Sequence, residues 1–252
     1  MDTETQARTA AKTRLREALA TYKGDTKHEM VAAAIAQLVE LNPTIAPARS
    51  ETLMDGQWLL INAPNFPNGE QRSDGKYMYT LGRVAFNMFQ PTGLKIVIDR
   101  VLQPVAFLEK PQQWTHDIIV EFTTVDEQIP TLQGIVHNFG VCEPTQDNTL
   151  QVKFTGSDLQ PKAQTDLEAW KAVFSNQSQP AKRGLKERLM VSVLKIIFGM
   201  VPPEGIDPKT GRVSFKMQRP PKGKLALLYL DEELRITRGE RGMVLVCERQ
   251  QP

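Results

Sequence analysis

From Asp55 onward, apolar residues recur at every second position, and this period constrains the fold more than any other feature. GLKIVIDRV places Leu94, Ile96 and Ile98 on one side of a strand, and HDIIVEFTTV does the same with Ile118 and Val120. Similar runs are GQWLLIN, RVSFKMQRP, GKLALLYL, ELRIT, MVLVCER and the pair around the turn EPTQDN. Seven to nine short, mostly consecutive strands predict an antiparallel meander that closes into a barrel, with a mixed α+β sandwich as the alternative.

Helical signals flank the strands. Leu15, Leu19 and Tyr22 recur at helical spacing, and KHEMVAAAIAQLVELNP carries a second apolar face that NPTIAP ends. TDLEAWKAVF and AKRGLKERLMVSVLKIIFGM predict further helices. We therefore expect a mainly β protein of the α+β class, with an N-terminal helical segment at 1–50 and a barrel domain at 51–252. A helical insertion at about 163–201 precedes the C-terminal strands.

Composition excludes several classes of function. A net charge of +2 predicts no nucleic-acid partner, and no apolar run is long enough to span a membrane. Cys142 and Cys247 match no metal-ligand spacing; they could pair only if the fold brings them close, and a reduced compartment is the simpler interpretation. The acids near the N-terminus argue against a transit peptide. The three histidines occur singly, and the motifs of nucleophilic, phosphate-binding and dinucleotide-binding sites are missing, so we expect no enzyme, cofactor or metal.

The segment LALLYLDEELRITRGERGMVLVCER resembles the C-terminal signature of the plastid lipid-associated proteins, also called fibrillins. LVELNPTIAP followed by LMDGQWLLIN, and YTLGRVAFNMFQP, are similar to two further segments of that family, in the right order. The signature positions are Gly56, Trp58, Tyr229, Leu230, Asp231, Leu234, Arg235, Ile236, Thr237, Arg238 and Gly239.

The resemblance implies a lipocalin-like barrel that binds lipids or prenyl-type pigments and quinones. Family members associate with plastoglobules and thylakoids in plants and with thylakoids in cyanobacteria. We interpret the chain as a cyanobacterial member with a role in photoprotection, peripheral on the cytoplasmic face of the thylakoid membrane. The alternative is a scaffold for photosynthetic membrane maintenance, whose barrel is filled by its own side chains and which docks a photosynthetic-complex protein. An enzyme built on the same barrel is the least favoured of the three interpretations.

The charged segment itself has two interpretations. Asp231 can pair with Arg235 or Arg238, and Thr237–Gly242 supplies a hairpin turn, so the cluster fixes the closing corner of the barrel. In the second interpretation, Arg235 or Arg238 binds the carboxylate or head group of a ligand. Candidate ligand-binding residues are Trp58, Tyr229 and Arg235.

The stretch from Lys182 to Met200 is a candidate for membrane contact. It combines a broad apolar stripe with an excess of basic residues, a pattern typical of helices that lie on anionic lipid surfaces. Candidate contact residues are Lys182, Arg183, Leu189, Val193 and Ile197. The same helix could equally cover the barrel, or act as a movable lid.

Overall fold

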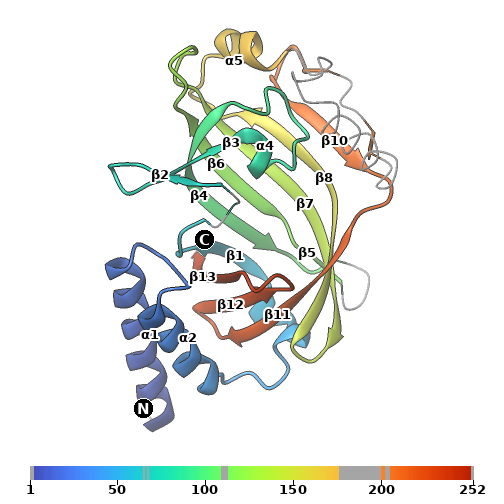
Figure 1. Ribbon diagram of the computed structural model, residues 1–252. Coiled ribbons are helices and arrows are strands. Elements are labelled where there is room, and N and C mark those ends of the chain that lie inside the picture. Colours follow the sequence, from blue (N-terminus) through green and yellow to red (C-terminus); the bar gives the residue numbers. More distant parts are fainter. Residues whose placement is uncertain are drawn as a thin grey trace.

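The computed structural model describes residues 3–64, 66, 68–108, 113–175, 200–201 and 205–250. Eight antiparallel strands close into a barrel in the order β1-β4-β6-β7-β8-β11-β12-β13, with β13 returning to β1 (Figure 1). This confirms the lipocalin-like barrel in the α+β class and sets the sandwich aside. The barrel strands are β1 (Gly56–Leu60), β4 (Lys95–Val105), β6 (Ile118–Thr124), β7 (Gln133–Gln146), β8 (Thr149–Pro161), β11 (Lys222–Leu230), β12 (Leu234–Gly239) and β13 (Val244–Gln250).

Among the described residues, five shorter strands and four short helices extend the barrel. The strands are β2 (Glu70–Gln71), β3 (Tyr77–Thr80), β5 (Trp114–Thr115), β9 (Met200–Val201) and β10 (Val213–Met217). The helices are η1 (Pro47–Arg49), α3 (Glu51–Met54), α4 (Leu81–Val84) and α5 (Leu167–Phe174). Asp166 caps α5 by accepting from the N–H groups of Glu168 and Ala169.

The end of the expected basic helix needs a correction. Met200 lies in β9 and pairs with Met217 of β10, so a strand occupies the position where the sequence indicated the last helical turn. Pairing with a neighbouring strand outweighs a local helical preference, because the partner satisfies the backbone groups. The residues proposed for membrane contact, 182–197, lie outside those that the structure describes.

The two N-terminal helices, α1 (Thr3–Thr21) and α2 (Glu29–Glu40), pack on the outer face of β11, β12 and β13 (Figure 1). Leu15, Leu19 and Ile35 are buried there against Leu234 and Ile236. The helices predicted from apolar spacing are therefore confirmed. Whether residues 1–50 form a separate unit from the barrel stays a prediction.

Two clusters of buried side chains lie inside the barrel, and its two ends are covered differently. At one end α4 and α5 bring Leu81, Trp170 and Phe174 onto a core that includes Phe122 and Val136. At the other end η1 and α3 contribute Ala48 and Met54, which lie against inward-facing residues of the strands. Those residues are Trp58, Val105, Cys142, Leu150, Val152, Leu227, Leu230 and Cys247.

Candidate functional site

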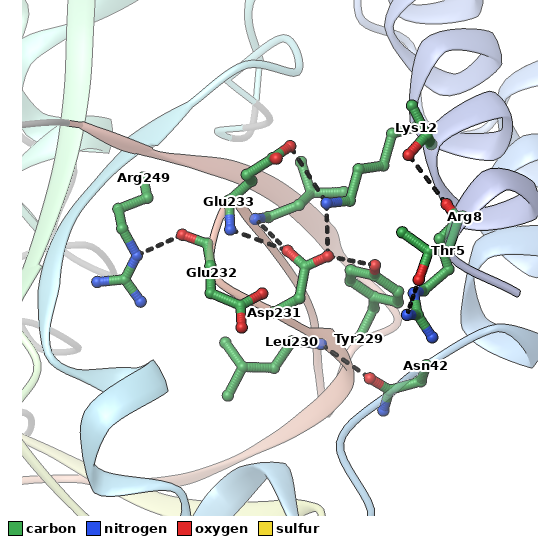
Figure 2. A network of polar contacts seen from close by, with 12 residues as sticks. Thr5, Arg8, Lys12, Asn42, Tyr229, Leu230, Asp231, Glu232, Glu233 and Arg249 are labelled. Atoms are coloured by element: carbon green, nitrogen blue, oxygen red, sulfur yellow. Dashed lines mark hydrogen bonds and ion pairs between the residues drawn. The ribbon is translucent and has the colours of Figure 1, made fainter. Parts of the chain in front are cut away.

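The acidic part of the signature segment forms the turn between β11 and β12 (Figure 2). Asp231 Oδ1 accepts from the backbone N–H groups of Glu233, at 2.9 Å, and Leu234, at 2.8 Å. Its other oxygen, Oδ2, accepts from the Tyr229 hydroxyl at 2.5 Å and lies 2.6 Å from Lys12 Nζ on α1. One buried carboxylate thus shapes the turn and attaches the first helix to the barrel.

The ionisation of Asp231 follows from these partners. Burial acts to raise the pKa of this carboxyl, but the hydrogen bonds from Lys12, Tyr229 and the two backbone N–H groups outweigh it and hold the pKa below its ordinary value. The partner of Asp231 therefore differs from the sequence expectation. It is Lys12, whereas Arg235 points into the barrel and Arg238 is exposed.

Arg235 lies on the opposite face of β12 from Leu234 and Ile236, and only 1% of its surface is exposed. Its Nη2 donates to Gln103 Oε1 at 2.6 Å, and its guanidinium lies 4.9 Å from the centre of the Trp58 ring. Trp58 is fully buried, and its indole N–H donates to the Met54 carbonyl at 3.0 Å. Two of the expected ligand-binding residues are thus brought together inside the barrel.

Tyr229, the third expected ligand-binding residue, is fully buried on the outer face of the barrel under α1 and α2. Leu230, next along β11, faces the interior. A bulge between Leu227 and Tyr229 sets this alternation. Tyr229 therefore stabilises the attachment of the helices.

Arg249 packs against both Gly56 and Trp58. The Arg249 guanidinium lies 4.3 Å from the centre of the Trp58 ring and donates to the backbone carbonyls of Leu53, Asp55 and Glu232. A Cβ at Gly56 would meet Arg249 Nη1 at 2.3 Å, and the backbone there adopts a φ of +136°. Gly56 therefore leaves the space in which Arg249 joins the start of β1 to the β11–β12 turn.

The β12–β13 hairpin has a shorter turn than expected. Thr237 and Arg238 belong to β12, and Arg238 pairs with Val244 across the hairpin. Gly242 has a φ of +79°, which glycine adopts without strain, whereas Gly239 ends a strand and is not among the residues with positive φ.

An open groove runs along the outside of the barrel beside α1. Its volume is about 570 Å³, and its floor includes Leu19, Ile61, Pro64, Tyr77 and Ile98. A second hollow of about 400 Å³ continues it past Phe66 and Tyr79, because the two share Gly24, Ala63, Pro64 and Tyr77. We call the two together the α1 groove. Neither part is lined by Trp58, Tyr229 or Arg235.

Charged residues form the rim of the α1 groove. Arg16 pairs with Glu248 at 2.5 Å and Lys76 lies 3.8 Å from Asp99, so these four charges largely balance. Lys23 also lines the groove and belongs to none of the ion pairs found among the described residues. The rim is thus slightly basic, and the floor beneath it is apolar.

Sequence reasoning missed Lys12, Gln103, Arg249 and the α1 groove. No local pattern marks them, because each depends on segments that are distant in the chain. Among the residues that the structure describes, no His, Cys, Asp or Glu cluster could hold a metal ion. None of the described helices has the length and apolar character needed to cross a membrane.

The closed antiparallel barrel, with a buried arginine inside and an apolar groove outside, defines a lipocalin-like protein. The chain matches the family model described as PAP_fibrillin over residues 11–248. Because this match covers nearly the whole chain, the chain belongs to the PAP_fibrillin family. No curated protein and no solved structure matches it.

Proposed function

We propose that this chain is a non-enzymatic protein that binds lipids or hydrophobic isoprenoids such as a carotenoid, a quinone or an acyl lipid. Membership of the PAP_fibrillin family and the barrel fold support this proposal. The α1 groove is the observation that carries it. Its main hollow, about 570 Å³, falls within the range of small-molecule sites, and it combines an apolar floor with a charged rim.

Such a groove suits an amphipathic molecule. Apolar burial along Ile61, Tyr77 and Ile98 would supply most of the affinity, at about 25 cal/mol per Å² before the cost of association. The slight excess of positive charge at Lys23 favours a polar or anionic head group at the rim.

A bulky substitution on the exposed face of α1 tests the groove without disturbing the core. Ala20 lines the groove and is exposed, so Ala20→Trp should fill it, whereas Ala10→Trp places the same side chain on an exposed part of the same helix away from it. We expect wild type and Ala10→Trp to bind oleic acid or a prenylquinone equally, and Ala20→Trp to bind about tenfold more weakly. Equal binding by all three, or binding by none, would refute the groove as the site.

The proposed location is the periphery of a thylakoid membrane or a lipid droplet, with the stretch 182–200 as the contact. This stretch lies outside the described residues except for Met200. Flotation of wild type and Ile197→Asp with anionic liposomes tests it, because an acid in the apolar stripe should weaken binding to the membrane surface. Equal flotation would remove this part of the proposal.

A second candidate function is a scaffold that docks a photosynthetic-complex protein. The observation in its favour is that large side chains such as Trp58 and Leu150 are fully buried inside the barrel end that η1 and α3 cover. A chain that binds neither oleic acid nor prenylquinone, but retains a partner protein from thylakoid extracts, would favour this function.

A further inference from the structure

Arg235 is short of strong hydrogen-bond acceptors, because the Cys247 thiol, a weak acceptor, is its other polar neighbour besides Gln103. Its Nη2 donates to Gln103, but Nε and Nη1 are buried and have no hydrogen-bond partner among the described residues. A guanidinium keeps its proton in proteins, so the charge is permanent even though burial lowers the pKa of Arg235. A buried charge without an opposite charge is costly, so these donors call for an explanation.

No carboxylate in the part of the chain that the structure describes is paired with Arg235. Burial and the nearby Arg235 charge lower the pKa of His116 to about 3, so its ring is neutral. Burial raises the pKa of Cys142 to about 12 and also raises that of Cys247, so both thiols stay protonated at neutral pH.

Two further unused donors occur on the strands around Arg235. The Thr237 hydroxyl lies two residues further along the inward face of β12, and it is buried without a partner among the described residues. The Trp114 indole N–H is buried and unpaired in the same way, and Trp114 is the cross-strand partner of Cys142. His116 Nδ1, close enough to feel the Arg235 charge, is also buried and unpaired, but a neutral imidazole does not balance a permanent positive charge. A buried cation with unpaired N–H groups suits an acceptor-only, negatively charged group.

We propose that the barrel interior binds one carboxylate group at Arg235. A monocarboxylate fits better than a phosphate, because one guanidinium balances one negative charge and a dianion would remain partly uncompensated. The carboxylate can belong to a small organic acid or be the head group of a fatty acid. This site is distinct from the α1 groove, whose lining does not include Arg235, so either proposal can fail alone.

The test measures the thermal unfolding midpoint of the full chain in sodium acetate or with added oleic acid, against sodium chloride at equal ionic strength. A ligand that binds only the folded state raises the midpoint. We expect acetate to raise it for wild type and for Arg238→Met, which removes an exposed arginine of the same strand, but not for Arg235→Met. Oleic acid, which the α1 groove is also proposed to bind, should raise the midpoint of Arg235→Met less than that of wild type. A rise with acetate indicates a small acid, and a rise with oleic acid alone that is smaller in Arg235→Met indicates a fatty-acid head group.

Three outcomes would overturn the proposal. The midpoint of wild type could fail to respond to either carboxylate, or Arg235→Met could respond as strongly as wild type. A third outcome does not depend on how the variant folds: thiolate absorbance of wild type at neutral pH would identify Cys142 or Cys247 as the counter-ion of Arg235. If Arg235→Met does not fold, Arg235→Lys keeps the charge, and we expect a weaker but measurable response.

Discussion

Lys12 Nζ lies 2.6 Å from Asp231 Oδ2, which joins the first helix to a turn near the other end of the chain (Figure 2). Both side chains are nearly buried, with 11% and 5% of their surface exposed. Neighbouring pairs, such as Arg16 with Glu248, are much more open to solvent. The buried pair should therefore contribute far more to the attachment of α1 than the exposed one.

Replacing Lys12 tests this difference. Lys12→Met leaves Asp231 buried beside Tyr229 without its cation, and we expect the free energy of unfolding to fall by about 3 kcal/mol in urea denaturation. The matched control is Arg16→Met, which removes the exposed pair and should cost less than about 1 kcal/mol. Similar losses for the two variants would contradict the role assigned to the buried pair.

His116 makes the stability depend on pH. Burial, followed by the Arg235 charge, lowers its pKa from 6.5 to about 3, so the folded chain keeps the ring neutral while the unfolded chain binds a proton below about pH 6.5. The contribution of the neutral His116 ring to the free energy of unfolding is therefore intact above that pH. It is lost progressively as the pH falls toward 3, and the free energy of unfolding decreases by up to about 1.4 kcal/mol per pH unit.

Urea denaturation between pH 7 and 5 checks this sign. We expect the unfolding free energy of His116→Gln to fall less steeply with decreasing pH than that of wild type, because glutamine binds no proton. Parallel curves would show that His116 is not held neutral by the fold.

Gly211 should be sensitive to any side chain. Its φ is +69°, and a Cβ there would lie 2.7 Å from Leu167 Cδ1 and 2.9 Å from Trp170 Cδ1. Gly75 has a φ of +83° with nothing within 4 Å, so Gly75→Ala measures the backbone cost alone, about 1 to 2 kcal/mol. We expect Gly211→Ala to cost about 1 to 3 kcal/mol more by thermal denaturation, since α5 must also shift. An equal loss at the two positions would mean that Trp170 adapts freely.

The two thiols should be unreactive in the folded chain. Cys142 and Cys247 are free and buried, each with 1% of its surface exposed, and burial raises the pKa of both. We expect dithionitrobenzoate to label neither of them in the native protein and both in urea. Rapid labelling of the native protein would indicate that the barrel opens on the timescale of the reaction.

Local patterns in the sequence predicted much of the fold. Alternating apolar residues located the eight barrel strands, and helical spacing located α1, α2 and α5, because each signal lies within one element. The short strand β3 and the helix α4 were missed, since four residues carry too little pattern to recognise. The fibrillin-like signature predicted the family, which the match over residues 11–248 confirms.

The site was less predictable, because its contacts depend on register and closure. Asp231 and Arg235 are four residues apart, and sequence distance favoured an ion pair between them. The strand geometry instead turns Arg235 inward toward Gln103, while Asp231 stays in the turn, where Lys12 reaches it. Neither Lys12 nor Gln103 is marked by a motif, so only the folded arrangement identifies them.

The pairing of β1 with β13 has a consequence for how the protein is made. β1 is the first of the barrel strands to leave the ribosome, and β13 is the last. Until β13 emerges, the nascent chain holds an open sheet with two unpaired edges and an uncovered apolar face, a form that invites aggregation or capture by a chaperone. Synthesis of the last strand therefore completes the whole nascent barrel. A chain truncated within β13 would keep its unpaired strand edges and would tend to aggregate.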